Sequence, residues 1–143
     1  MTTRTLTRFA TKEDGQALVE FALIMPFLLL FLVGIVEFGR AWNEHDALTD
    51  ATREGARQAA VYDDAGLVTV DSIDNVIKRV LASNHMMPDS ATITLTNWDG
   101  GSNTPLTVKV EYPYRFVFFG ALANWALGTR KVVLTSSFTM RNE

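Results

Sequence analysis

The sequence predicts an α+β protein: a long N-terminal transmembrane helix that continues into a stalk, then a small domain with one amphipathic helix and roughly three antiparallel strands. Three observations predict this fold class. They are a 20-residue apolar run near the N-terminus, apolar residues spaced by three and four positions further along, and alternating apolar and polar residues towards the C-terminus. The length of 143 residues suits one small domain with such an appendage.

The apolar run extends over residues 17–36. Hydrophobic side chains fill 17 of its 20 positions, and the exceptions are Glu20, Pro26 and Gly34. Twenty helical residues span about 30 Å, which is the thickness of the hydrocarbon core of a bilayer. The run is rich enough in Leu, Ile, Phe and Val to outweigh one carboxylate near its end, so membrane insertion is favoured. Pro26 is expected to kink the helix or open its hydrogen-bond ladder.

Basic residues set the expected topology of this span. Arg4, Arg8 and Lys12 precede it. The positive-inside rule therefore keeps the N-terminus in the cytoplasm and places residues 37–143 on the far side of the membrane. A cleaved secretory signal is disfavoured, because charged and bulky residues follow the run where a cleavage site needs small ones. A plain, uncleaved anchor stays open as the alternative.

A glycine and a carboxylate lie at the head of the run. Gly15 precedes Glu20 by five residues, and residues 15–21 resemble the processing site of type IV prepilins. That resemblance implies a cut between Gly15 and Gln16, so that residues 1–15 form a cleaved cytoplasmic leader. In the alternative, Glu20 lies at the headgroup boundary and reaches water, which leaves a shorter apolar run of about 24 Å.

The chemistry of such a cut gives Glu20 a role. Cleavage creates an α-ammonium at the edge of an apolar helix, and a carboxylate one turn further on in a neighbouring subunit can neutralise that charge where water is scarce. Glycine at the cut leaves the backbone accessible. Glu20, followed by Phe21, is therefore predicted to pair with the new N-terminal amine during assembly.

A longer stretch of the chain carries a wider resemblance. It resembles the TadE-like family, the pilus-assembly proteins of the tight-adherence (type IVc) secretion system, at Gly15 and over residues 17–26, 34–40 and 51–57. The resemblance implies a minor pilin or pseudopilin with a pilin-like domain, processed by a prepilin peptidase and acting in pilus assembly or initiation. It also implies the bacterial cytoplasmic membrane as location, with entry into a surface pilus left open. The implied partners are the prepilin peptidase, other pilins or pseudopilins, and the inner-membrane assembly platform.

The helical pattern continues beyond the membrane run and predicts a helix over about residues 16–60. A small residue recurs at every fourth position, which lets another backbone approach closely. These residues are Ala47, Ala51, Gly55 and Ala59. Their face either packs against the protein's own domain, residues 61–143, or forms a seam between subunits; both readings stay open.

Residues 62–70 are predicted to connect the stalk to a second helix. In that second helix, apolar residues recur with helical spacing: Ile73, Val76, Ile77, Val80 and Leu81. Asp71 or Ser72 is the expected N-cap.

Strict alternation predicts strands over residues 91–96 and 106–112, and a third strand is expected over residues 131–140. A glycine-rich hairpin loop joins the first two. Residues 116–127 are strongly apolar but too few to cross a bilayer. They are expected to cover the sheet or to offer a hydrophobic patch to a partner.

Nothing in the sequence predicts an enzyme, a cofactor or a metal site. His45 and His85 fall in different predicted elements, the chain has no Cys, and no nucleotide-binding or hydrolase motif occurs. The net charge of −3 argues against a nucleic-acid partner. The main alternative to a pilin is an uncleaved, membrane-anchored extracytoplasmic binding module, whose contact surface would be the loop at 98–103 or residues 116–125.

Overall fold

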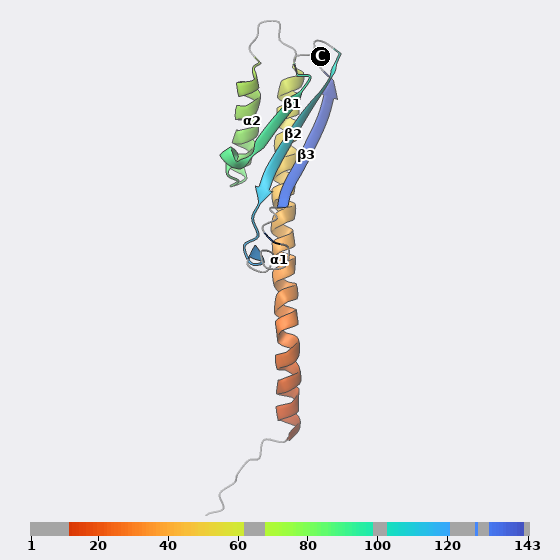
Figure 1. The fold of residues 1–143 in the computed structure, drawn as a ribbon, viewed down its shortest axis with the longest axis vertical. Coiled ribbons are helices and arrows are strands. Elements are labelled where there is room, and N and C mark those ends of the chain that lie inside the picture. Colours follow the sequence, from red (N-terminus) through yellow and green to blue (C-terminus); the bar gives the residue numbers. More distant parts are fainter. Residues whose placement is uncertain (1–11, 62–67, 99–102, 121–127, 129–131, 142–143) are drawn as a thin grey trace, which may run out of the picture. The chain divides into compact units, whose positions relative to one another are not determined.

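The computed structural model describes residues 12–61, 68–98, 103–120, 128 and 132–141. It contains two α-helices, a short 3₁₀ helix and three strands (Figure 1). Their bounds are α1 Lys12–Ala60, α2 Val70–Ser83, η1 Pro88–Ser90, β1 Thr92–Thr96, β2 Pro105–Tyr114 and β3 Val132–Arg141. The predicted α+β class, with a long apolar N-terminal helix and a three-stranded antiparallel sheet, is confirmed.

The chain forms two compact units, Met1–Val36 and Glu37–Glu143. The apolar part of α1 belongs to the first unit. The predicted stalk, from Glu37 to the end of α1, belongs to the second unit together with α2 and the sheet.

Within the first unit, α1 is helical from Lys12, four residues before the predicted start, and it remains helical across Pro26. Its large apolar side chains are exposed, among them Leu18, Phe27 and Phe31 at 68–69%. In the described part of the chain this is the one helix whose length and composition suit a membrane span. An exposed apolar surface on every side is what a lipid-facing helix requires.

In the second unit the sheet has the order β1-β2-β3, and both strand pairs are antiparallel. Val108 on the central strand lies opposite Leu95 on β1 and Phe138 on β3. The central strand alternates as predicted but continues to Tyr114 through Pro113. Proline is tolerated there because β1 pairs only as far as Glu111, so β2 beyond that point has a free edge that needs no N–H.

Helix α2 buries Ile73, Ile77 and Leu81, in agreement with the predicted spacing. The predicted N-cap was wrong, because the helix begins earlier and Thr69 caps it. The Thr69 hydroxyl accepts from the Ser72 backbone N–H at 3.2 Å, and the Ser72 hydroxyl accepts from the Thr69 N–H at 2.9 Å. This reciprocal capping box satisfies two backbone donors that the first turn would otherwise leave unpaired.

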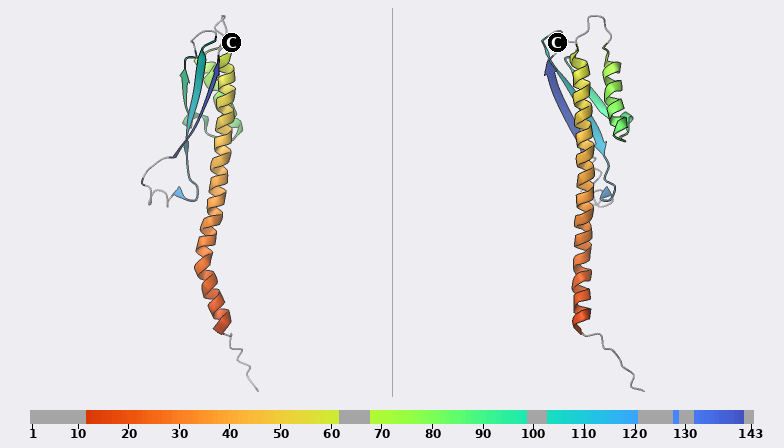
Figure 2. Two further views of the ribbon diagram at one scale, coloured as in Figure 1. Left: turned by 90° about the vertical axis from the view of Figure 1, so that its right-hand side faces the viewer. Right: turned by 180° about the vertical axis from the view of Figure 1, so that it is seen from behind.

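The part of α1 that lies in the second unit and α2 cover the same face of the sheet (Figure 2). The core between them contains Leu48, Ile77 and Val108, none of which is exposed. The small-residue row of α1 is also buried here: Ala47, Ala51, Gly55 and Ala59. A Cβ atom at Gly55 would lie only 2.5 Å from Cδ1 of Ile77. The row therefore packs against the protein's own domain, one of the two readings that the sequence left open.

Candidate functional site

The predicted processing site lies in the first turn of α1. Gly15 is helical, and a Cβ placed on it would meet no atom within 4 Å. The first four N–H groups of a helix have no partner within it, so unwinding this turn breaks few hydrogen bonds. The space beside the Gly15 backbone is thus unoccupied by other parts of the described chain.

The structure joins two of the predicted site residues. The side-chain amide of Gln16 donates to Oε1 of Glu20 at 2.9 Å, one helical turn away. Phe21 is 56% exposed. Gln16 and Glu20 therefore share one face of the helix, directly after the predicted cut.

A second carboxylate, Glu37, accepts hydrogen bonds from four groups of the described chain. It is only 3% exposed. Its Oε1 accepts from the Tyr114 hydroxyl at 2.8 Å and from the Val117 N–H at 3.0 Å, and its Oε2 accepts from the Phe118 N–H at 2.9 Å. Arg40 adds an ion pair at 3.2 Å. The carboxylate thereby fastens the segment after β2 to the first residue of the second unit.

The electrostatics of this group follow from its surroundings. Burial alone raises the pKa of Glu37, but the N–H groups of Phe118 and Val117, the Tyr114 hydroxyl and the charge of Arg40 bring that pKa below its ordinary value. Glu37 is therefore ionised at neutral pH. Burial, together with the hydrogen bond and the negative charge of Glu37, raises the pKa of Tyr114 to about 12.

No separate role of Glu37 is predicted from the sequence. The residue lies within the family-like segment 34–40, among the charged and bulky residues that argue against a signal-peptide cleavage site. Its position directly after the apolar run was a usable signal, because a carboxylate there needs water or a partner. The partners themselves, 77 to 81 residues further along the chain, follow no local pattern.

Part of α1 is similar to a known protein family. Residues 15–57 match the family model of TadE-like protein. The match covers the stretch over which the resemblance was predicted, and that resemblance is confirmed. Neither the curated proteins nor the solved structures contain a match to the chain.

The C-terminal part of the TadE-like segment, residues 51–57, has two faces. Ala51, Gly55 and Ala56 are buried in the core of the domain. On the opposite face, Arg57 forms a salt bridge with Glu54 at 2.6 Å. At Gly55 the missing side chain leaves room for Ile77 of α2, so this element serves the packing of the domain.

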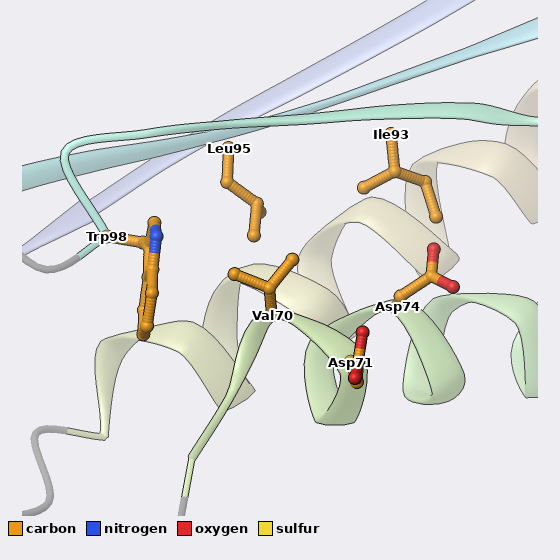
Figure 3. Close-up of a pocket in the computed structure, with 6 residues that line it drawn as sticks. All are labelled: Val70, Asp71, Asp74, Ile93, Leu95 and Trp98. Carbon is orange, nitrogen blue, oxygen red and sulfur yellow. The ribbon is translucent and has the colours of Figure 1, made fainter. Parts of the chain in front are cut away.

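A cavity of about 300 Å³ opens between α2 and β1 (Figure 3). Ile93 and Leu95 of β1 face it from one side and Val70 of α2 from the other, with Trp98 at one end. Its polar lining is acidic and consists of Asp71 and Asp74. Such a lining suits an apolar group that carries a positive charge. The predicted contact loop at 98–103 is described only at its two ends, because residues 99–102 lie outside the described part of the chain. Residues 121–127 of the predicted apolar segment also lie outside it.

No group of three or more potential metal ligands occurs among the described residues. His45 and His85 are both exposed and lie in separate places, on α1 and after α2.

The raised pKa of Tyr114 gives a direct test of the Glu37 site. An alkaline titration of the full chain in detergent, followed by tyrosinate absorbance, should contain a component with a pKa of about 12. Because the folded pKa is raised, the stability contribution of Tyr114 is complete below its ordinary pKa of 10.0 and is lost as the pH rises towards 12. The loss is expected to be about 2–3 kcal/mol.

Two phenylalanine variants separate this tyrosine from its neighbour on β2. Tyr114→Phe should remove the component near 12. Tyr112→Phe, whose lost hydroxyl accepts from the Met87 N–H at 3.1 Å, should retain it. A component near 12 that survives in Tyr114→Phe would contradict the assignment.

Proposed function

We propose that this protein is a minor pilin or pseudopilin of a tight-adherence (type IVc) pilus system, cut by a prepilin peptidase and acting in pilus assembly or initiation. The observation that carries the proposal is the TadE-like match, which begins at Gly15 and continues through the exposed apolar helix. The protein would function by assembling with other subunits through this helix and would not act on a substrate.

The exposed apolar side chains of α1 support this role. A helix whose large side chains are all accessible can be covered by lipid before assembly and by the helices of other subunits afterwards. The same surface would then hold the subunit in the cytoplasmic membrane and pack it in the assembled state.

The bond between Gln16 and Glu20 supports the proposed pairing. After cleavage, Gln16 would carry the new α-ammonium. Glu20 already accepts from the Gln16 side chain through Oε1, so the carboxylate is held at the face where this terminus lies. The ammonium of a neighbouring subunit would form a charge-assisted hydrogen bond with the same carboxylate.

The first experiment determines the intact mass and N-terminal sequence of the full chain expressed with and without the cognate prepilin peptidase. We expect loss of residues 1–15 only when the peptidase is present, and blocked or slowed loss in Gly15→Ala. Gly34→Ala is the matched control, since it changes a glycine of the same helix that also has nothing within 4 Å of its Cβ position. Cleavage of that variant should be normal.

The role of Glu20 is tested separately from the cut. Glu20→Gln retains the shape and an acceptor but removes the charge, so it should still be cleaved and should fail to support pilus assembly. Mass analysis of the cleaved product also shows whether Gln16 has cyclised with loss of ammonia, which would remove the ammonium. Assembly that proceeds normally with Glu20→Gln would contradict the pairing and leave the cleavage untouched.

The second candidate function is an uncleaved, membrane-anchored binding module, and the cavity beside Trp98 favours it. If the N-terminus stays intact when the chain is expressed with a peptidase that cuts its own major pilin, this function is favoured over that of a pilin. The decisive variant would then be Asp71→Asn, which removes a charge from the cavity lining at an exposed position.

A further inference from the structure

Four large hydrophobic residues are exposed, either within five positions of Glu37 on α1 or in the segment whose backbone bonds to it: Phe38 at 68%, Trp42 at 60%, Val117 at 61% and Phe118 at 57%. We call them the Glu37 patch. The rings of Phe38 and Trp42 contact each other, with centroids 6.1 Å apart. Exposed apolar side chains gathered at one place on a domain usually mark a surface that something covers.

The part of the patch that follows β2 is held in place by the chain itself. The Val117 and Phe118 backbones donate to the two oxygens of Glu37 at 3.0 and 2.9 Å. Phe116, just before them, packs edge-on against Tyr114 with centroids 5.2 Å apart. The backbone is therefore fixed while the side chains of Val117 and Phe118 remain exposed, as in a preformed contact surface.

The covalent chain determines where this surface lies. Glu37 directly follows Val36, the last residue of the predicted span, so the residues bonded to Glu37 lie within one side-chain length and one hydrogen bond of the first residue beyond that span. The headgroup layer on each side of a bilayer is about 5–7 Å deep, which includes this position. Tryptophan is enriched at that depth, and the exposed Arg115 supplies a positive charge suited to anionic headgroups.

We propose that the Glu37 patch is a second membrane contact, in which Val117 and Phe118 enter the headgroup layer on the far side of the membrane from the N-terminus. The occupant of the patch is phospholipid. The inference rests on the membrane anchor of the proposed function but not on cleavage or pilus assembly. It gives the domain a fixed attachment to the bilayer beside its helix.

The experiment uses the absence of Cys from the sequence, which makes any introduced cysteine unique. Full-length Phe118→Cys, labelled with a nitroxide, is reconstituted at low density into vesicles of phosphatidylethanolamine and phosphatidylglycerol. Phe31→Cys in the apolar helix and Thr94→Cys on the exposed side of β1 are the lipid and water references. We expect the label at 118 to lose accessibility to a water-soluble relaxing agent several-fold relative to the label at 94, and to gain accessibility to oxygen.

Three results would overturn the proposal. A label at 118 that is as accessible to water as the label at 94, while the label at 31 is in lipid, removes the second contact and leaves the anchor intact. Protection at 118 that disappears on dilution into more lipid, with spin–spin broadening before dilution, assigns the patch to a second copy of the chain. A label at 31 that remains in water removes both the anchor and the contact, whereas failed cleavage affects neither.

Discussion

Replacing Glu37 by alanine is expected to lower the free energy of unfolding by about 3–5 kcal/mol. The change leaves the N–H groups of Val117 and Phe118 without their acceptor, and it takes from the Tyr114 hydroxyl one of its two acceptors, since the Glu37 carbonyl oxygen at 3.1 Å remains. It also takes from Arg40 one of its two carboxylate partners. The measurement is chemical denaturation of the full chain in detergent, followed by tryptophan fluorescence.

Glu44→Ala is the matched control. Glu44 lies on the same helix and pairs with the same Arg40 at 3.3 Å, but its side chain is 22% exposed and this pair is its one ion pair in the described chain. Its removal should cost less than about 1 kcal/mol. Equal losses for the two variants would show that Glu37 is an ordinary surface carboxylate.

The same site predicts an acid limit to stability. Because the pKa of Glu37 is lowered in the folded state, its contribution is complete above the ordinary value of 4.5 and is lost as the pH falls through the folded pKa. Glu37→Gln should therefore lose less stability than the native chain below pH 4.5. Parallel pH profiles for the two proteins would contradict the lowered pKa.

The contact between Gly55 and Ile77 predicts the second large effect. Ile77→Ala removes a fully buried side chain and should cost about 2–5 kcal/mol. Gly55→Ala places a Cβ 2.5 Å from Cδ1 and Cγ1 of Ile77 and forces that side chain to move. Overpacking of this kind costs about 1–3 kcal/mol, against a gain of about 1 kcal/mol from the better helix former.

The double variant is more informative than either single change. Once Ile77 is alanine, both crowding atoms are gone, so Gly55→Ala fills part of the cavity and should stabilise the protein. Gly39→Ala is the control, because its Cβ position meets nothing within 4 Å and only the helix preference should be seen. Strictly additive effects of the Gly55 and Ile77 changes would show that the two helices do not meet there.

Elements with a clear repeat could be predicted from the sequence. Alternation located β1 and β2 to within one or two residues, and the spacing of Ile73, Ile77 and Leu81 located α2. The N-cap was missed because two hydroxyl residues and a carboxylate stand within four positions, and the choice depends on where the helix begins. The small-residue row supported two readings until its burial in the core of its own domain was known.

The candidate sites divide in the same way. The processing site could be predicted because its features, Gly15, Glu20 and the apolar run, are contiguous in the sequence, and it stays a prediction for the cleavage experiment. The Glu37 site could not, because a carboxylate next to an apolar run gives no sign of a tyrosine and two backbone N–H groups brought to it by the end of β2. Such groups meet only when the sheet is in place.

The buried row at positions 47, 51, 55 and 59 restricts how copies of this chain are able to associate. All four residues are buried in the core of their own domain, and at Gly55 the close neighbour is Ile77 of the same molecule. A second copy that used this row would have to displace α2 and disrupt the domain. A bundle of several such helices must therefore form its contacts at other positions of α1. The exposed apolar residues 17–36 are available for such contacts, because covering them does not disrupt the packing of the domain.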